Sequence, residues 1–187
     1  MRANGGRTPR SIGSRPEVAD AGRVHEPTTF ADWHAINTLL MTYAEHLDAG
    51  RFDDVAAMFE HSTYRIEHAD GEHVSNYEDA APVRAFCEQT RRYSNGTPRT
   101  KHVITNVVID VDGDRAGARC YATVFQQTDV LPLQPIASGR YVDQFERVDG
   151  TWRFADRLIT GFLLGDRSQH VAWHDGTPDD AATQRPI

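Results

Sequence analysis

The sequence lacks several features that would each point to a particular class of protein. Only two of its 187 residues are cysteines, Cys87 and Cys120. They could form a disulfide, but two reduced core thiols in a cytoplasmic protein are the expected arrangement. No apolar run approaches the roughly 18 residues that a membrane-spanning helix needs. The formal net charge of −7 argues against nucleic acid or an anionic membrane as the partner.

Motifs that bind phosphate or activate a nucleophile are missing as well. The chain has no Gly-rich phosphate loop, no G-x-S-x-G segment and no CxxC pair. Its nine histidines raise the question of a metal. His170 and His174 are four residues apart, as two ligands on one helix would be, but no glutamate follows in the pattern of a zinc protease. We therefore predict no metal and no cofactor.

The folded part is expected to be one domain between two arms. Residues 1–27 are rich in Gly, Pro and Arg without a sustained apolar period, and residues 175–187 have the same character. We predict a disordered N-terminal arm and a flexible tail. The domain between them spans 28–174, and the overall apolar content of 39% is enough for a real core.

Helical periodicity dominates the first half of this domain. Apolar residues recur at helical spacing over 30–47, which predicts a helix that ends at Gly50. A second, short helix is predicted over 52–59, and a third over 78–93.

The second half of the domain has the pattern of long strands separated by turns. Helices followed by a meander of strands indicate an α+β layer fold. The strand around 103–109 is apolar on both faces, so we expect its outer face to be buried in a dimer. The predicted strands cover a short hairpin around 63–75 and long antiparallel segments near 100–111, 115–128, 137–148 and 151–163.

Three positions could carry acid–base chemistry if the fold brings them together. Tyr43 and Asp48 lie near the end of the first helix, and His102 opens a strand on the face of Ile104, Asn106 and Val108. An aspartate at a helix C-terminus costs up to about 1 kcal/mol unless a cation compensates it. An aspartate can fix the tautomer of a histidine, so this pair would make a general base. The structural alternatives are a solvated aspartate, a core tyrosine and a satisfied core histidine.

Arg157 on the last strand is a candidate for binding a polar group of a ligand. Strict alternation places it on the face opposite to Phe154 and Leu158. An arginine in a cavity suits a carbonyl, carboxylate or hydroxyl group. The alternative is an internal salt bridge with Asp143 or Asp48. Substrate-binding candidates of weaker standing are the apolar Phe59, Tyr64, Phe86 and Phe125 and the polar Arg140.

Taken together, these segments resemble a SnoaL-like member of the nuclear transport factor 2-like superfamily. The resemblance covers about residues 30–163 and rests on segments within 36–48, 52–59, 101–106 and 139–152. It implies a cone-shaped α+β barrel in which three N-terminal helices pack on a strongly curved, mostly antiparallel sheet. The superfamily contains dehydratases, cyclases, isomerases, epoxide hydrolases, dioxygenase β subunits and non-catalytic binding proteins, so the fold alone does not give the function.

Within this superfamily the chain most resembles bile acid 7α-dehydratase, scytalone dehydratase and hexachlorocyclohexane dehydrochlorinase. These enzymes use a His–Asp pair for cofactor-independent elimination. The resemblance implies that Tyr43, Asp48, His102 and Arg157 are the catalytic residues. A further pocket carboxylate of the bile acid enzyme would fall near Phe125, where this chain has no Asp or Glu, so the substrate stays open.

The resulting prediction is a dehydratase, a lyase acting on a hydrophobic, oxygenated ring compound that is steroid-like or polyketide-like. His102 would remove a proton, Asp48 would orient His102, Tyr43 would bind the carbonyl or the departing hydroxyl, and Arg157 would hold a polar end of the substrate. Two alternatives remain: a polyketide cyclase or isomerase, and a non-catalytic small-molecule-binding module. We expect a homodimer or homotrimer formed through the sheet.

Overall fold

The computed structural model describes residues 28–68 and 71–171. The predicted arm and tail, 1–27 and 175–187, lie outside the described residues. The helices are α1 (Phe30–Asp48), α2 (Phe52–Ala57) and α3 (Ala80–Cys87). The strands are β1 (Thr63–Glu67), β2 (Val74–Glu78), β3 (Thr100–Asp112), β4 (Arg115–Gln126), β5 (Gln134–Val148) and β6 (Thr151–Leu164).

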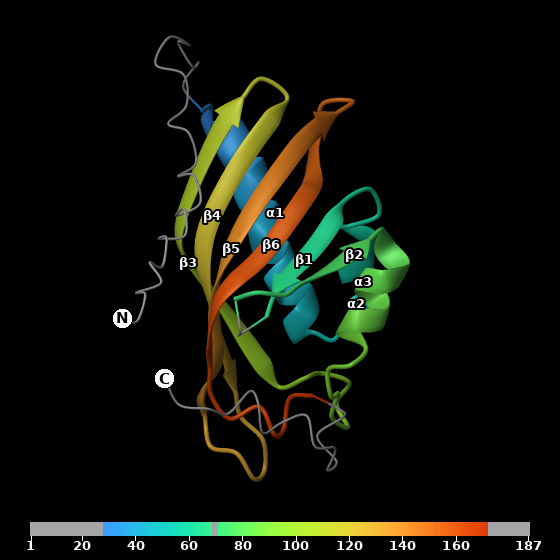
Figure 1. Ribbon diagram of the computed structural model, residues 1–187, viewed down its shortest axis with the longest axis vertical. Helices are drawn as coiled ribbons and strands as arrows, with labels where there is room; N and C mark the ends of the chain where they lie inside the picture. Colours follow the sequence, from blue (N-terminus) through green and yellow to red (C-terminus); the bar gives the residue numbers. More distant parts are fainter. Residues whose placement is uncertain (1–27, 69–70, 172–187) are drawn as a thin grey trace, which may run out of the picture.

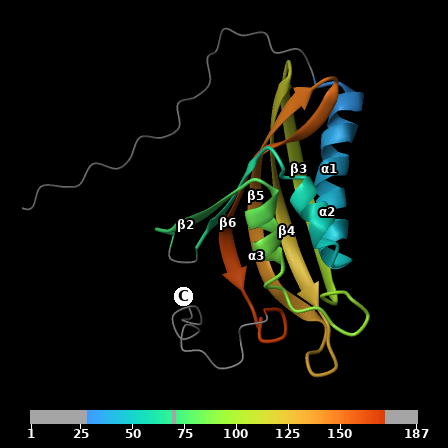
Figure 2. The ribbon, with the colours of Figure 1, turned by 90° about the vertical axis from the view of Figure 1, so that its right-hand side faces the viewer.

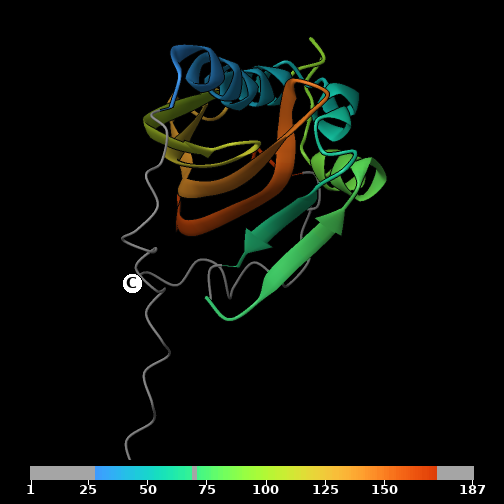
Figure 3. The ribbon, with the colours of Figure 1, turned by 90° about the horizontal axis from the view of Figure 1, so that it is seen from above.

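The strands form one six-stranded sheet in the order β2-β1-β6-β5-β4-β3. Every neighbouring pair is antiparallel except β1 and β6, which are parallel. Figure 2 shows α1 running along the long strands, with the β1–β2 hairpin projecting away from them. Seen from above, β3 to β6 curve strongly and α1 lies along their open side (Figure 3). The predicted α+β cone with three N-terminal helices and a mostly antiparallel sheet is therefore confirmed.

Helix α1 is held on the sheet by an apolar stripe. Ile36, Leu40, Tyr43 and Ala44 are buried, at the three- and four-residue spacing that places side chains on one helical face. Thr29 caps the helix, because its hydroxyl accepts a hydrogen bond from the Asp32 N–H at 3.1 Å. None of the helices in the described ranges is long and apolar enough to cross a membrane.

Helix α3 is shorter than the sequence predicts, Ala80–Cys87 instead of 78–93. After its end the backbone pairs with a distant segment instead of continuing the helix. The N–H of Arg91 donates to the carbonyl of His170 at 2.7 Å, and Thr90 forms an antiparallel bridge with Val171. This long-range pairing satisfies backbone groups that further helical turns would otherwise have used.

Two of the register shifts in the sheet are β-bulges that reverse side-chain directions predicted from the sequence. In β3 the register against β4 shifts between Thr105 and Val108, and Asn106 has a φ of 55°. His102 and Ile104 are partly buried before the bulge, whereas Val108 is exposed after it. The prediction that Asn106 and Val108 share the face of His102 is therefore wrong, because an extra residue inverts the alternation.

The second bulge lies in β6, where the register against β5 shifts between the pairs Gln144–Asp156 and Phe145–Phe154. Ala155 is the extra residue. As a result Phe154 and Arg157 are both buried, although strict alternation predicted opposite faces for them. That prediction is wrong for the same reason: one inserted residue reverses the side-chain direction of the residues that follow it.

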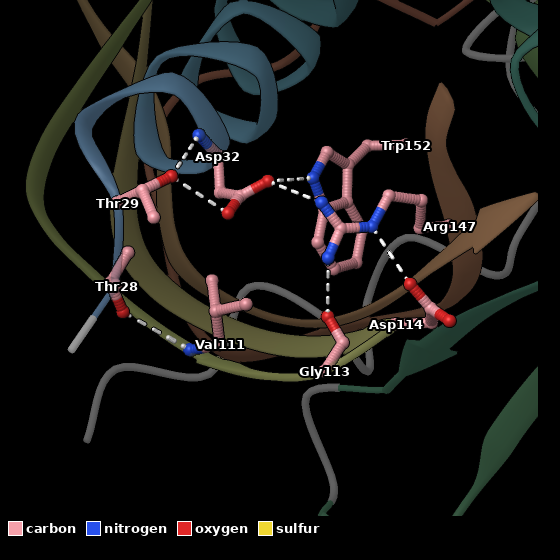
Figure 4. A network of polar contacts seen from close by, with 8 residues as sticks. All are labelled: Thr28, Thr29, Asp32, Val111, Gly113, Asp114, Arg147 and Trp152. Carbon is pink, nitrogen blue, oxygen red and sulfur yellow. Dashed lines mark hydrogen bonds and ion pairs between the residues drawn. The ribbon is translucent and has the colours of Figure 1, made fainter. Parts of the chain in front are cut away.

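A polar network joins the start of α1 to the turn between β3 and β4 and to the neighbouring ends of β5 and β6 (Figure 4). Asp32 accepts hydrogen bonds from the indole N–H of Trp152 at 2.9 Å and from Arg147 at 2.8 Å. Arg147 also donates to the Gly113 carbonyl at 2.7 Å and to Asp114 at 2.9 Å. The Trp152 hydrogen bond is the main cause of a lowered pKa for Asp32, which therefore stays charged and able to accept these bonds.

Replacing Asp32 is expected to destabilise the fold. In Asp32→Ala the Trp152 N–H and one Arg147 N–H lose their acceptor, which should lower the free energy of unfolding by about 2 kcal/mol. The matched control is Asp114→Ala, which removes a carboxylate that is 77% exposed and should change it by less than about 1 kcal/mol. Urea denaturation measures both values, and equal losses would contradict the anchoring role of Asp32.

Candidate active site

Asp48 and His102 are in direct contact where the end of α1 meets the start of β3. The Asp48 carboxylate accepts hydrogen bonds from Nδ1 of His102 at 2.6 Å and from the backbone N–H of His102 at 2.8 Å. The hydroxyl of Thr100 donates to the same carboxylate at 2.8 Å. The side chains of His102 and Asp48 are only 10% and 11% exposed. Three donors thus converge on one carboxylate in a partly desolvated setting.

These contacts define the tautomer of His102. An ionised carboxylate can only accept hydrogen bonds, so the hydrogen between Asp48 and His102 lies on Nδ1. In the uncharged ring, Nε2 then carries the lone pair and is the nitrogen that can accept a proton. This is the arrangement in which an aspartate orients a histidine as a general base and stabilises the imidazolium formed when it takes a proton.

The hydrogen bonds also compensate the unfavourable position of Asp48 at the negative end of α1. Burial raises the pKa of Asp48, but the hydrogen bonds and charge of His102 and the hydroxyl of Thr100 outweigh it, so the net pKa is lowered. Asp48 therefore remains a carboxylate at neutral pH. Thr100 was not identified from the sequence, although its position two residues before His102 places it on the same face of the strand.

Arg157 forms a buried salt bridge with Asp143. Its Nε and Nη2 donate to the two oxygens of Asp143 at 2.7 and 2.8 Å, and both side chains are 0% exposed. Burial alone would lower the pKa of Arg157, but the carboxylate of Asp143 raises it, so the guanidinium stays charged. Of the two arrangements that the sequence left open, the structure therefore shows the salt bridge with Asp143.

Aromatic rings surround the buried guanidinium of Arg157. The guanidinium carbon, Cζ, lies 4.1 Å from the centre of the Tyr43 ring and 4.4 Å from the centre of the Tyr141 ring. The Nη1 group has no hydrogen-bond partner in the described ranges, and these electron-rich faces stabilise it in place of one. The Tyr43 hydroxyl contacts the Tyr64 hydroxyl at 2.7 Å. Burial raises the pKa of Tyr43 well above its ordinary value, so its hydroxyl stays protonated.

Three of the predicted apolar wall residues meet in one aromatic cluster. The ring of Tyr64 lies 5.0 Å from that of Phe59 and 5.9 Å from that of Phe86. Phe59 also contacts Tyr43, at 5.8 Å between ring centres. The cluster thus joins the residues around Arg157 to α3, and it forms part of the main core.

Phe125 and Arg140 lie elsewhere. Phe125 is paired with the exposed Lys101, one position along from the His102–Val124 pair, so it lies on the face of the sheet opposite to His102. Arg140 is exposed and is paired with the exposed Tyr121. The structure therefore does not bring these two residues to the site of Asp48 and His102.

A second histidine near His102 was missed from the sequence. The sequence pattern indicates His170 only as half of a metal pair with His174, and His174 lies outside the described residues. Burial, together with the charges of His102 and Arg167, lowers the pKa of His170 to about 4. The segment that carries it reaches this end of the sheet through long-range pairing, which no local pattern reveals. The described part of the chain contains no cluster of three or more His, Cys, Asp or Glu that could hold a metal.

Comparisons with solved structures give the same fold. Rv3472 from Mycobacterium tuberculosis, a protein of unknown function, is 22% identical with a TM-score of 0.58 over 82% of this chain and 84% of that chain. A candidate scytalone dehydratase from Novosphingobium aromaticivorans is 22% identical with a TM-score of 0.55, over 73% and 89% of the two chains. The β subunit of a candidate aromatic-ring-hydroxylating dioxygenase from the same organism is 20% identical with a TM-score of 0.57, over 74% and 94%.

These identities are low enough that the likeness shows the fold alone. The comparison with curated proteins found no match. The family model of the SnoaL-like domain matches residues 28–158. This range includes Asp48, His102, strands β1 to β5 and the first half of β6, as far as Leu158. The chain therefore belongs to the SnoaL-like domain family and has the α+β fold of the nuclear transport factor 2-like proteins.

Proposed function

We propose that the protein is a cofactor-independent lyase that removes water from a hydrophobic, oxygenated ring compound of steroid-like or polyketide-like character. The observation that carries this proposal is the contact between Asp48 and His102. A partly buried carboxylate that holds Nδ1 leaves Nε2 as a base, and that is the group an elimination next to a carbonyl needs. A candidate scytalone dehydratase among the structural relatives is in keeping with the same chemistry.

The proposed reaction has two steps and returns the protein to its starting state. His102 Nε2 removes a proton from the carbon beside a carbonyl, and the electron pair moves to the carbonyl oxygen. The carbonyl then re-forms as the hydroxyl on the next carbon departs, taking the proton from His102 and leaving as water. Asp48 stays charged throughout and stabilises the imidazolium between the two steps.

Tyr43 and Arg157 are given a supporting part in this proposal. Tyr43 is 1% exposed and its hydroxyl is in contact with Tyr64, while Arg157 donates through Nε and Nη2 to both oxygens of Asp143. These contacts support a rigid inner wall more than a direct bond to substrate. Phe59, Tyr64 and Phe86 extend that wall with apolar surface.

Product analysis tests the proposal. A panel of bicyclic β-hydroxy ketones, such as tetralones bearing a β-hydroxyl, is incubated with the protein. The masses of the products are then measured by mass spectrometry. Loss of one water in the presence of wild type, and not of His102→Gln, is the expected result. A product of unchanged mass would assign the site to a cyclase or isomerase. Binding without any product would favour a non-catalytic binding module and contradict the lyase.

We also propose that the outer face of the sheet is buried between copies of the chain, as a homodimer or homotrimer. Val103, Thr123, Ser138 and Leu163 form one row across β3 to β6. Leu163 in this row is 62% exposed. Tyr121, two residues before Thr123 on β4, is 50% exposed. Relatives that include a dioxygenase β subunit and an association domain support assembly of this fold.

Light scattering of Tyr121→Lys tests this surface. Beside the exposed Arg140, a lysine at position 121 would add a second positive charge to a face buried between copies, where it has no partner. The variant is therefore expected to be monomeric while the wild type is oligomeric. Val148→Lys, at the end of β5 and away from this row, is the control and should keep the wild-type mass. A monomeric wild type, or an oligomer that Tyr121→Lys leaves intact, would contradict the proposal.

A further inference from the structure

The segment that follows β6 returns to the end of the sheet where Asp48 and His102 lie. The carbonyl of Gln169 accepts hydrogen bonds from the Tyr93 hydroxyl at 2.7 Å and from the side-chain amide of Gln126 at 3.2 Å. Gln126 is the ladder partner of Thr100, and the Thr100 hydroxyl binds Asp48. Gln169 is thus connected to Asp48 in three steps. Its carbonyl binds the Gln126 side chain, Gln126 pairs with Thr100 across the two strands, and the Thr100 hydroxyl binds the Asp48 carboxylate.

His170, the next residue, is held by its own backbone. Its carbonyl accepts the N–H of Arg91 at 2.7 Å, and its N–H donates to the Arg167 carbonyl at 2.9 Å. The adjoining Val171 is bridged to Thr90. The backbone of His170 is thus fixed on both sides close to the start of β3, and a fixed backbone is what a functional side chain requires.

The imidazole of His170 has an unused hydrogen-bonding atom. Its Nδ1 is buried and has no hydrogen-bond partner within the described residues, while the side chain as a whole is only partly buried. A buried N–H without an acceptor is rarer in proteins than a buried acceptor without a donor. The hydrogen of the uncharged ring is therefore placed on Nε2, and Nδ1 carries the lone pair.

His170 and His102 then have complementary properties. Asp48 holds His102 with its hydrogen on Nδ1 and its lone pair on Nε2, so His102 accepts a proton. His170 has no carboxylate partner among residues 28–68 and 71–171, and its low pKa keeps the ring uncharged at neutral pH with one N–H to donate. His170 is near enough to His102 to be affected by its charge, and an uncharged imidazole near a base is suited to binding a carbonyl oxygen on which negative charge develops.

We propose that His170 is a second catalytic imidazole, whose Nε2–H donates a hydrogen bond to the carbonyl oxygen of the ring substrate while His102 removes the neighbouring proton. The inference rests on the proposed function and adds the group that receives the developing negative charge. When the C–H bond breaks and its electron pair moves to oxygen, the hydrogen bond from His170 shortens and strengthens. When the hydroxyl leaves as water and the carbonyl re-forms, the bond returns to its initial strength, and His170 keeps its hydrogen.

Three variants of His170 test which nitrogen acts. His170→Gln keeps an amide N–H near the position of Nε2, His170→Asn keeps one near Nδ1, and His170→Phe keeps only the ring shape. On a tetralone bearing a β-hydroxyl, loss of one such donor is expected to lower kcat by about 10²-fold with little change in KM. We expect this loss in His170→Phe and His170→Asn, and recovery to within about 10-fold of wild type in His170→Gln. Wild-type kcat in His170→Phe would overturn the proposal.

A binding measurement separates this proposal from the proposed function. A nitronaphthol, whose nitro group keeps the hydroxyl ionised at neutral pH so that it imitates the enolate, is titrated into wild type and His170→Phe and followed by its absorbance. Weaker binding to the variant by about 10-fold or more, equivalent to one lost hydrogen bond to a charged group, supports the contact even if no lyase activity is found. Equal affinities in variants with unchanged melting temperatures would overturn it, even if His102 proves essential for turnover.

Discussion

Replacing His102 by glutamine is expected to lower turnover by at least about 10²-fold, the range for a lost general base. Glutamine can still accept a hydrogen bond, but it cannot take a proton from carbon at neutral pH. The measurement is product formation from the β-hydroxy tetralones at saturating substrate, with the melting temperature of the variant as the check on folding.

Matched variants distinguish the base from its surroundings. Lys101→Gln changes the exposed neighbour of His102 on the same strand and should leave turnover within about 2-fold of wild type, as for a surface substitution away from the chemistry. Asp48→Ala should lower turnover by at least about 10²-fold, because His102 then loses the group that fixes its tautomer. Wild-type turnover in a folded His102→Gln or Asp48→Ala would show that the two residues are not the acid–base pair.

Breaking the buried pair of Arg157 and Asp143 is expected to give the largest loss of stability. Asp143→Leu leaves a guanidinium that is 0% exposed without its carboxylate, which should lower the free energy of unfolding by about 3–5 kcal/mol. Replacing both residues, as in Asp143→Leu with Arg157→Met, removes the uncompensated charge and should restore most of that loss. Urea denaturation of the single and double variants measures the difference.

The same double variant decides the role of Arg157 in activity. If Arg157 supports the inner wall, a folded double variant should keep turnover within about 10-fold of wild type, because the chemistry at His102 is unchanged. A folded double variant with turnover reduced as far as His102→Gln would show that Arg157 binds the substrate, as the sequence resemblance implies. A double variant no more stable than Asp143→Leu would contradict the pairing as the source of the instability.

The sequence predicts much of the fold because local and periodic signals agree with it. The apolar stripe of α1, with Gly50 just after its end, and the long alternating strands are readable from residue spacing alone. The pairing of Asp48 with His102 could also be anticipated, since a carboxylate at a helix C-terminus needs a compensating donor.

The remainder depended on contacts that spacing does not encode. One inserted residue near Asn106 and another at Ala155 reverse the alternation of two strands, and the second moves Arg157 into the core beside Asp143. The early end of α3 and the position of His170 both arise from pairing between segments about 80 residues apart in the chain. Such tertiary contacts override local pattern. Phe125 as a wall residue and Arg140 as a polar substrate-binding residue had no positional signal behind them, and the structure places both elsewhere.

The state of the His102 ring tests the central claim most directly, because that claim is a base held by Asp48. Imidazole nitrogen NMR shifts, assigned by comparison with His102→Gln, are recorded for wild type and Asp48→Asn near neutral pH. We predict that the uncharged His102 ring of wild type carries its hydrogen on Nδ1 and a lone pair on Nε2, and that Asp48→Asn abolishes this preference. A hydrogen on Nε2 in wild type, or shifts that Asp48→Asn leaves unchanged, would contradict the account.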